Sequence, residues 1–462
     1  MNLDIATLFA AREAERYALH ARYLNEQLVR VLKTVGFDVG FCQGDGQYLI
    51  DRQGTRYLDL MSGWGVFALG RNHPALRDAL MSVLDARLPN LIHMDASPLA
   101  GVLAERLLQL VPYLDKAYFA NSGTETVETA LKFARCATGR AGIVYCSHAY
   151  HGLTYGALSI NGDETFRTGF APFMGNCTEV PFDDLEALDR ALATRQVGAF
   201  IVEPIQGKGV NVPSDDYLPT GLRLCRKYGT VFIADEVQTG LGRTGRFLAM
   251  EHWGVEPDIV LLSKALSGGH VPVGAVLTRK WIFDKVYDRM ERSMAHGSTF
   301  GKNDLAMAAA LATLEVLKSE RVIENAAQTG EKLIAALGKM SAQYELVKAV
   351  RGKGLMIGIE FGQPRSFKLR ATWAALQAMS SELFCQIIII PLFKEHKILS
   401  QVAGHGIHTI KVQPALTITD ADCDWIIRSF DQVIADAHRG PAAALSLGRT
   451  LVDHAVRARA TA

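Results

Sequence analysis

Residues 231–240 read VFIADEVQTG, and residues 259–269 read IVLLSKALSGG. In both stretches a short, almost wholly apolar run of strand-forming residues ends in charged or small polar side chains. Such runs indicate strands that are buried on both faces, as in a parallel sheet covered by helices. These two stretches therefore predict the fold class.

The same alternation extends to both sides, from about residue 90 to residue 315. Each short apolar strand is followed by a loop that contains glycine or serine, and then by a helix. The predicted strands are 116–119, 142–146, 199–203, 231–235, 259–262 and 275–278. This alternation predicts an α/β fold with a mostly parallel central sheet in a large domain.

The segments that flank the large domain have a different character. After residue 315 we predict a helix at 326–340, strands at 346–350, 355–361 and 409–412, and a helix at 420–437, which indicate a smaller α+β domain. Near the N-terminus, apolar positions at helical spacing over residues 5–33 precede a hairpin at 48–51 and 57–60. The apolar run from Ile387 to Ile390 ends at Pro391 and is interpreted as a buried strand.

We therefore expect four parts in the chain. Residues 1–60 form a helix and hairpin segment that packs with the small domain, and residues 61–315 form the large domain. Residues 316–438 form the small C-terminal domain, and residues 439–462 form a tail with helical spacing. The N-terminal helix has an apolar face that needs cover, on this chain or on a partner chain.

Composition excludes several classes of protein. The 462 residues are 49% apolar and 21% charged, which is typical of a globular chain with a large core. The 49 basic residues nearly balance the 48 acidic ones, so the formal net charge is +1. A nucleic-acid or anionic-membrane binder would carry a basic excess. No apolar run approaches the ~20 residues that cross a bilayer, so we expect neither nucleic-acid nor membrane partners.

The seven cysteines are scattered and form no C-x-x-C pair. They suggest neither a disulfide framework nor a zinc site, so we expect no metal and a reducing compartment. Asp4, Glu13 and Glu15 argue against a secretory or mitochondrial targeting segment. The expected location is the cytoplasm.

Ligands of open parallel sheets lie beyond the carboxyl ends of the strands, so the residues directly after each predicted strand are the candidates for binding. After strand 116–119, Ser122 and Glu125 have the spacing of a capping box at the start of a helix. Gly123 and Thr124 leave backbone N–H groups at the positive end of the helix dipole, where a phosphate can bind. The alternative is a well-capped helix with no ligand.

Three further strand ends carry unusual side chains. Tyr150 and Gly152 follow strand 142–146, and the aromatic ring either stacks on a flat ligand or belongs to the core. Asp235 follows a buried strand, and burying a charge is costly unless it has a cationic partner. Lys264 ends another central strand, where an amine is costly to bury unless it reacts or has a partner, and the alternative is a structural surface lysine.

Together these features specify one ligand better than any of them does alone. A phosphate cradle, a stacking aromatic, an acid and a lysine at one sheet edge suit an aromatic aldehyde phosphate. The lysine would form an imine with it, and the acid would keep its ring nitrogen protonated. That ligand is pyridoxal 5′-phosphate (PLP), whose ring acts as an electron sink for a carbanion.

With these residues in view, the chain resembles the class III PLP-dependent aminotransferases of fold type I, which include ornithine and ω-amino acid aminotransferases. The resemblance covers about residues 45–435. It rests on the ordered motifs SGTE, YHG, VEPIQG, DEVQTGLGRTG, LSKALSGG, HGSTFG and RGKG.

The resemblance implies roles for individual residues. Lys264 would be the Schiff-base lysine, and Asp235 the partner of the pyridine nitrogen. The implied cofactor contacts come from Ser122, Gly123, Thr124, Tyr150, Gly152, Glu203, Asp235, Val237, Gln238, Lys264 and Thr299. Among these, Tyr150 and Val237 would cover the two ring faces, and Gln238 would bond the phenolic oxygen. Thr299 would reach the phosphate of the neighbouring subunit, which implies a homodimer with a shared active site. Arg243 is interpreted as structural.

Two positions bear on the substrate. Family members that bind an α-carboxylate usually have arginine where this chain has Lys411, often paired with a glutamate at the position of Glu203. Lysine lacks the bidentate fork of arginine, so the usual carboxylate clamp is weakened. Trp64 would form an apolar wall of the substrate site, with a plain core tryptophan as the alternative. We therefore expect one substrate that is not an α-amine.

The predicted activity is transfer of an amino group between an amine or amino acid donor and an oxo acid, aldehyde or ketone. Its substrates are small amines and carbonyl compounds. The alternatives on the same scaffold are a phospho-lyase or a racemase, neither of which needs an oxo acid for turnover. A catalytically silent binding protein is a third alternative, but such a protein would be expected to have lost Lys264 or Asp235.

Overall fold

The computed structural model describes residues 3–379 and 383–439. Its centre is a seven-stranded sheet with the order β4-β10-β9-β8-β7-β5-β6. These strands are β4 (Lys116–Ala120), β5 (Gly142–Cys146), β6 (Cys177–Val180), β7 (Val197–Val202), β8 (Val231–Asp235), β9 (Ile259–Leu262) and β10 (Gly274–Thr278). The β5–β6, β5–β7, β7–β8 and β8–β9 pairs are parallel, and β10 is antiparallel to both of its neighbours. The predicted α/β fold with a mostly parallel sheet is confirmed.

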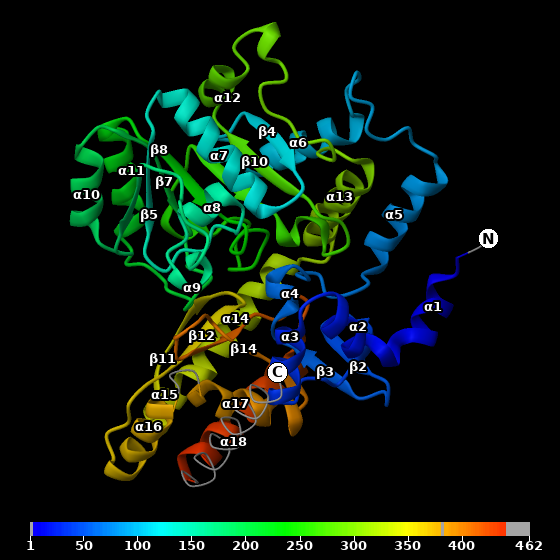
Figure 1. Cartoon of the computed structure of the whole chain (residues 1–462), viewed down its shortest axis with the longest axis vertical. Coiled ribbons are helices and arrows are strands. Elements are labelled where there is room, and N and C mark those ends of the chain that lie inside the picture. The colour runs from blue at the N-terminus through cyan, green and yellow to red at the C-terminus, as the bar shows by residue number, and fades with distance from the viewer. Residues whose placement is uncertain (1–2, 380–382, 440–462) are drawn as a thin grey trace.

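Helices cover both faces of this sheet (Figure 1). One face packs on α7 (Gly123–Thr138), α8 (Tyr155–Ser159) and α12 (Lys280–Val286) through one core cluster. The other packs on α6 (Pro98–Leu110), α10 (Leu185–Ala193), α11 (Tyr217–Tyr228) and α13 (Asp304–Ser319) through a second, larger cluster. Alternate residues of one strand, such as Ile233 and Phe232 of β8, belong to different clusters. Their alternation explains why the strand sequences are apolar without interruption.

The later part of the chain forms a separate antiparallel sheet with the order β11-β12-β15-β14. Its strands are β11 (Val347–Lys353), β12 (Met356–Phe361), β14 (Gln401–Val402) and β15 (Thr409–Val412). Helices α14 (Val322–Gly338), α15 (Met340–Gln343), α16 (Phe367–Met379) and α18 (Asp420–Arg439) accompany it. The predicted α+β character of this region agrees with these elements, whereas the exact domain limits at residues 60, 315 and 438 stay predictions. The tail from residue 440 lies outside the described residues.

The N-terminal hairpin lies beside the C-terminal region. It is part of a sheet with the order β1-β2-β3-β13, made of β1 (Phe41–Asp45), β2 (Tyr48–Asp51), β3 (Arg56–Asp59) and β13 (Ile398–Leu399). Strand β13 pairs in parallel with β3, so segments more than 300 residues apart in sequence share one sheet. The connection between β3 and α5 (Pro74–Asp85) then runs beside the segment that follows β15, because the Leu60 and Ala68 carbonyls accept hydrogen bonds from the amides of residues 413 and 416.

Two sequence-based predictions are wrong. The run from Ile387 to Ile390 lies in α17 (Leu383–Lys394) and not in a strand. All four isoleucines are buried, and a short apolar run cannot by itself distinguish a buried helix from a buried strand. Residues 5–33 do not form one helix either. They form α1 (Ile5–Arg12), a short 3-10 turn, α2 (Arg16–Tyr23) and α3 (Glu26–Val35), because Asn25 caps a new helix start.

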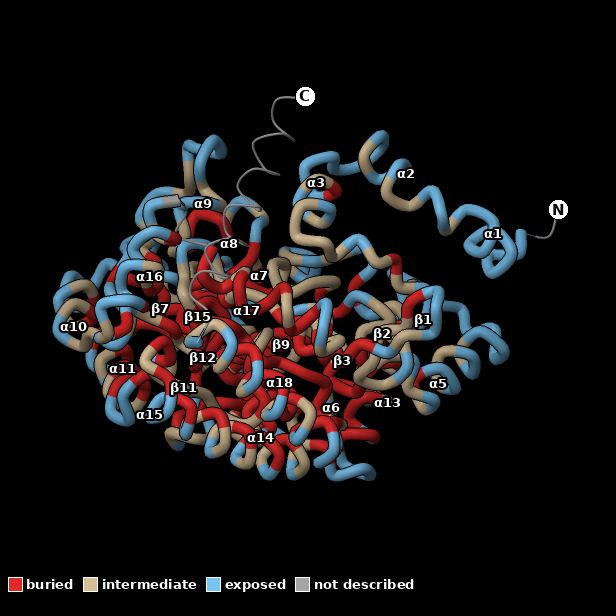
Figure 2. The backbone as a smooth tube through the Cα atoms, turned by 90° about the horizontal axis from the view of Figure 1, so that it is seen from below, coloured by how far each residue is buried: buried red, intermediate tan, exposed pale blue. Residues whose placement is uncertain are grey.

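Helices α1 and α2 project from the body as an arm, and most of their surface is exposed (Figure 2). Within residues 3–379 and 383–439, no single helix is long and apolar enough to span a membrane. Only the pair 367–378 and 383–394 meets that test together, and this pair is bent by 100°.

Candidate active site

The predicted site residues gather at the carboxyl ends of neighbouring strands. Asp235 is the last residue of β8, and Lys264 begins a 3-10 turn directly after β9. Glu203 follows β7, and Ser122 precedes α7 just after β4. Because the connected strands run in parallel, their ends meet at one edge of the sheet, as expected for an open α/β fold.

Asp235 is a buried carboxylate with both oxygens engaged. Its Oδ2 lies 2.7 Å from His151 Nδ1, and its Oδ1 accepts a hydrogen bond of 3.1 Å from the Val237 amide. His151 is also buried, and its Nε2 has no hydrogen-bond partner in the described part of the chain. The pair fixes the position of one negative charge at the base of the site. Sequence reasoning missed this role of His151, which was read only as part of the YHG segment after β5.

Lys264 is held in a left-handed backbone conformation with φ of 41°. Loss of solvent around its ammonium lowers its pKa, while the nearby Asp235 and Glu203 act in the opposite direction. A lowered pKa raises the share of neutral amine, which is the form that attacks a carbonyl carbon. The strand-end placement of Lys264 and Asp235 therefore joins a nucleophilic amine and a fixed anion in one site.

The start of α7 has the features of a phosphate cradle. Ser122 Oγ accepts a hydrogen bond of 3.3 Å from the Glu125 amide, while Glu125 Oε2 accepts one of 2.7 Å from the Asn121 amide. The reciprocal cap thus reaches one residue further back than the predicted capping box. A Cβ at Gly123 would lie 2.8 Å from Val237 Cγ1, so the close approach of these two segments requires glycine here. The amides at this helix start lack intrahelical partners and suit an anion.

The loop after β5 packs closely against this cradle. Thr124 Oγ1 lies 2.7 Å from Thr154 Oγ1. Gly152 has φ of 121°, and a Cβ there would lie 2.3 Å from Thr124 Oγ1. Tyr150 is half-buried, and its ring makes an edge-on contact with Phe166 at 5.4 Å between centroids. The structure therefore places Tyr150, Gly152 and Thr124 in one neighbourhood.

Glu203 is held by backbone amides. Its Oε1 accepts a hydrogen bond of 2.9 Å from the Tyr150 amide, and its Oε2 accepts one of 2.7 Å from the Gly207 amide. Burial raises the pKa of this carboxyl group, although nearby His151 partly opposes the effect. Glu203 therefore shapes the loops on both sides of the site.

Lys411 is buried on β15 and faces the same region from the small sheet. Its Nζ donates to the Gly207 carbonyl at 2.6 Å and to Gln238 Oε1 at 3.2 Å. Burial, reinforced by repulsion from Lys264, lowers the pKa of Lys411 to about 7. The lysine that replaces the usual arginine is thus tied to neutral oxygens instead of to Glu203.

Trp64 lies in the short helix α4 (Ser62–Gly65), between β3 and α5. Its side chain is 62% exposed, so the alternative of a core tryptophan is wrong. Its backbone has φ of 58°, and its carbonyl oxygen accepts a hydrogen bond of 3.4 Å from Gln238 Nε2. Gln238 therefore connects the Trp64 segment to Lys411.

Thr299 is exposed in the segment that leads to α13. The adjacent Ser298 accepts a hydrogen bond of 2.6 Å from Asn121 Nδ2, next to the cradle. Among the described residues, no hydrogen bond joins Thr299 to Gly123 or Thr124 of its own chain. The structure therefore leaves Thr299 on the surface at the rim of the site.

Arg243 is buried, close enough to Lys264 for its positive charge to help lower the pKa of that lysine. It donates to the Leu355 carbonyl at 3.1 Å and to the Pro414 carbonyl at 2.5 Å, and burial lowers its pKa to about 9. These bonds connect the GRTG loop to the small sheet, in agreement with a structural role.

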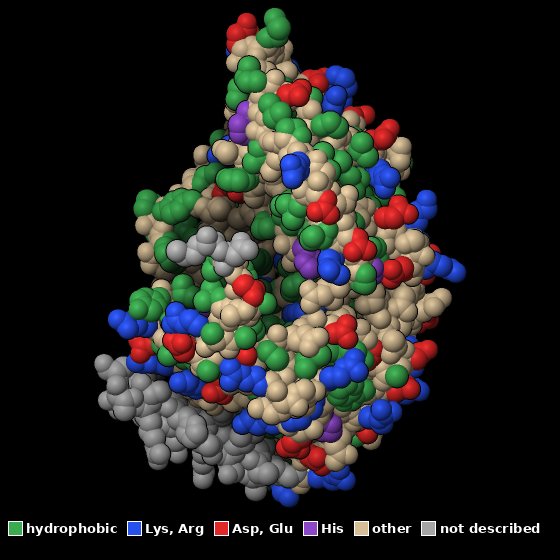
Figure 3. Space-filling view, turned by 90° about the vertical axis from the view of Figure 1, so that its right-hand side faces the viewer, with side chains coloured by type: hydrophobic (Ala, Val, Ile, Leu, Met, Phe, Trp, Pro, Cys, Tyr) green, Lys and Arg blue, Asp and Glu red, His purple; other side chains and the backbone are tan. Residues whose placement is uncertain are grey.

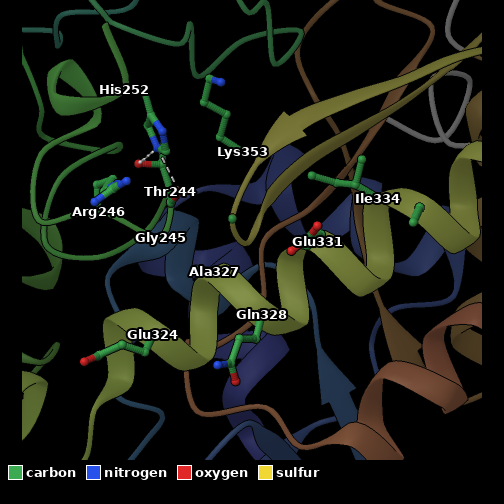
Figure 4. Close-up of a pocket in the computed structure, with 12 residues that line it drawn as sticks. Thr244, Gly245, Arg246, His252, Glu324, Ala327, Gln328, Glu331, Ile334 and Lys353 are labelled. Atoms are coloured by element: carbon green, nitrogen blue, oxygen red, sulfur yellow. Dashed lines mark hydrogen bonds between the residues drawn. The ribbon is translucent and has the colours of Figure 1, made fainter. Parts of the chain in front are cut away.

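A separate cavity of about 730 Å³ lies beyond that loop, between residues 244–246, α14 and the β11–β12 turn (Figure 4). Its labelled side chains include Arg246, Glu331 and Lys353, and His252 Nε2 contacts the Thr244 carbonyl at 3.0 Å on its wall. None of the predicted site residues lines it. The size of this cavity therefore does not identify the functional site.

The predicted residues fit PLP in three respects. The start of α7 offers unpaired amides to a phosphate, Lys264 offers an amine to an aldehyde, and Asp235 offers a fixed anion to a protonated ring nitrogen. Val237 lies against Gly123 at the start of α7, and the Tyr150 amide bonds Glu203. The chemistry of the donor set thus agrees with the predicted cofactor.

Comparison with known proteins adds independent information. The family model for class-III aminotransferases matches residues 35–434. Aminotransferase PigE of Serratia sp. is 38% identical over 89% of this chain, and the chain spans about half (52%) of the length of PigE. The putrescine aminotransferase of Pectobacterium atrosepticum is 37% identical, with 92% of this chain and 89% of that protein covered.

Solved structures show the same likeness. The ornithine aminotransferase of Toxoplasma gondii has a TM-score of 0.83 and 29% identity, covering 96% of this chain and all of that one. An amine transaminase from an uncultivated Pseudomonas species, solved in its PLP-bound form, has a TM-score of 0.74 and 29% identity. It covers 86% of this chain and 94% of that one.

Proposed function

Because this chain belongs to the class III aminotransferases, which are PLP-dependent enzymes of fold type I, we propose that it transfers an amino group from a donor with a non-α amine to an oxo acid, aldehyde or ketone. The observation that carries the proposal is Lys411. This lysine is buried and bonded to Gly207 and Gln238, where a carboxylate clamp would need a free arginine fork. Putrescine and ornithine, named for two of the similar proteins, both carry terminal amines.

The residues of the site have separate tasks. When bound, PLP supplies an aldehyde that captures the amine and a ring that withdraws electrons from the substrate carbon. The cradle of Ser122, Gly123 and Thr124 would hold its phosphate, and Asp235, fixed by His151, would hold a proton on its ring nitrogen. Lys264 moves a proton to and from the substrate carbon as general base and acid. Tyr150 and Val237 would cover the two faces of the ring.

The direct test uses half-reactions. The purified holoenzyme is mixed with single amines or amino acids and no acceptor, and the absorbance change of the cofactor is followed. We expect terminal diamines and ω-amino acids to react faster than small α-amino acids. A phospho-lyase or racemase would instead complete turnover without any added oxo acid, and that result would contradict amino transfer.

Lys411→Arg provides the first quantitative prediction. A bidentate arginine outperforms a single ammonium contact on a carboxylate by about tenfold in affinity. Half-reactions with α-amino acids should therefore improve by about that factor, and those with terminal amines should improve less. The effect should be largest above pH 7, because the pKa of Lys411 is lowered to about 7 and its charge is lost there, whereas arginine stays charged. Equal changes for both substrate classes would contradict this role of Lys411.

We also propose that the protein forms a homodimer in which the two subunits share each active site. We further propose that it is located in the cytoplasm. Apolar side chains are exposed on the face that carries α1 and α5, among charged ones (Figure 3). They include Ile5, Leu8, Phe9, Met81 and Leu84, while Phe300 is exposed beside Thr299. A patch of this kind favours burial against another copy.

The free thiols of the exposed Cys42 and Cys136 support a reducing compartment.

The shared site predicts complementation between two inactive variants. Lys264→Ala disables its own site, whereas Thr299→Ala disables the cradle of the neighbouring subunit. A mixed dimer should collect both lesions in one site and leave the other site whole, so activity should return when differently tagged chains are co-expressed and purified as heterodimers. Verified heterodimers that remain as inactive as either parent would contradict the shared site.

A further inference from the structure

Gln413 is a buried side chain for which the fold provides no hydrogen-bond partner. It is 0% exposed, and neither its Nε2 nor its Oε1 has a hydrogen-bond partner within the described residues. Its backbone is anchored, because its amide donates to the Leu60 carbonyl at 3.0 Å. Burial of an amide without partners costs folding free energy, so such groups are uncommon unless a ligand or an ordered water completes them.

The amide lies at the substrate end of the site. Gln413 directly follows β15 (Thr409–Val412) and comes two residues after Lys411, so an extended backbone that continues the strand directs both side chains to the same side. A Cβ at Gly65 would lie 2.7 Å from Gln413 Nε2 and 3.9 Å from Gln238 Cγ. The missing side chain of Gly65, whose φ is 91°, therefore leaves the two glutamines close together.

Two neighbouring side chains, Lys411 and Gln238, are already paired with each other and with backbone groups. Lys411 bonds the Gly207 carbonyl and Gln238 Oε1, and Gln238 Nε2 bonds the Trp64 carbonyl. Gln413 is the member of this cluster whose amide has both ends unpaired, within the residues that the structure describes. An amide offers an acceptor and two donors, and a rotation about its last bond exchanges them.

We propose that Gln413 determines specificity by binding the polar end of the substrate that is remote from the reacting carbon. Both amide atoms are buried against the Gly65 backbone, so this backbone has to shift when a substrate binds. The amide then presents Oε1 to the distal ammonium of a diamine donor and Nε2 to the distal carboxylate of an oxo-acid acceptor. One neutral side chain thereby serves two substrates of opposite charge that occupy the same site in turn. This inference rests on the proposed amino transfer, because only that reaction brings both substrates to one site.

The test separates the two ends of the amide. Gln413→Leu removes both, so KM should rise roughly tenfold or more in each half-reaction, with a smaller change in kcat. Gln413→Glu keeps the acceptor and replaces the donor by an anion. It should therefore leave KM for a terminal diamine within about threefold and raise KM for a dicarboxylic oxo acid more than Gln413→Leu does. Gln377→Leu is the matched control, because Gln377 Nε2 is also buried without a partner but lies on α16, away from the site.

The melting temperature distinguishes recognition from a structural role. Gln413→Leu should melt at the same temperature as wild type or higher, because it removes an unpaired buried amide. A lower melting temperature with unchanged KM values would make the residue structural and overturn the proposal. Unchanged KM values in both half-reactions would also overturn it, while leaving amino transfer intact. Failure of every amine to react with the wild-type holoenzyme would instead overturn the proposed function, and this inference with it.

Discussion

Lys264→Ala is expected to abolish turnover while the chain keeps its fold. Proton transfer by a positioned side chain contributes roughly 10²–10⁴-fold to a rate, and this substitution also removes the covalent anchor of the cofactor. The loss should therefore be at least of that size. Lys264 is suited to both tasks because loss of solvent lowers the pKa of its amine. The fold should survive because the residue lies in a short turn after β9 and its loss removes no strand hydrogen bond.

Two measurements isolate the role of Lys264. Reduction with borohydride followed by denaturation should leave the cofactor attached to the wild-type chain and release it from the variant. Circular dichroism and melting temperature should be close to those of wild type. Lys280→Ala is the control, because Lys280 is an exposed lysine of α12 paired with Asp284 and should keep normal turnover and attachment. A Lys264→Ala enzyme that transfers amino groups at the wild-type rate would show that another residue is the anchor.

The central sheet could be predicted from sequence because its strands are buried on both faces. Predicted strands 142–146 and 259–262 coincide with β5 and β9, whose apolar runs are bounded by glycine or polar residues. Strand β6 was missed because it lies at the sheet edge and reads CTEV, with Val180 as its one buried residue. An edge strand needs little apolar surface, so periodicity offers no signal for it.

Other features depend on contacts that no local pattern reports. The four isoleucines of α17 are buried because α16, α18 and β13 pack on this helix, with Val35 and Phe37 packed against Ile390. The sequence cannot distinguish that environment from a sheet. The N-terminal region breaks at Asn25 because the Asn25 side chain caps a new helix, although the apolar residues keep a helical spacing across this position. In both cases tertiary structure decided between two locally acceptable conformations.

The active site also contains some residues that the sequence could predict and others that it could not. Lys264, Asp235 and the start of α7 were predictable because strand ends in a parallel sheet converge. His151 was not, because its pairing with Asp235 depends on the path of a loop from β5 across β7 to the end of β8. Gln413 was not, because its place next to Gln238 depends on the close approach of Gly65. Residues whose roles arise from the approach of two distant segments need the three-dimensional structure.

Asp235→Asn should reduce half-reaction rates by about 10² or more, with little change in melting temperature. The amide keeps the size of the carboxylate and can still bond His151 and the Val237 amide, which lie at 2.7 and 3.1 Å from the carboxylate oxygens. It cannot supply a negative charge, and a neutral partner no longer favours a protonated ring nitrogen. An unprotonated ring is a weaker electron sink, so proton removal by Lys264 slows.

The adjacent carboxylate provides the control that separates charge from burial. Glu236 is also buried, but its oxygens accept from Thr239 Oγ1 and from the Met250 amide, and burial raises its pKa to about 7. Because a large share of Glu236 is already uncharged near neutral pH, Glu236→Gln should leave the half-reaction rate within a few-fold of wild type. Stopped-flow half-reaction rates of the two variants with one amine show whether the charge of Asp235 is required. A wild-type rate for Asp235→Asn would mean that His151 and Asp235 only shape the site. A loss confined to Asp235→Asn would mean that the anion beside His151 is what the chemistry requires.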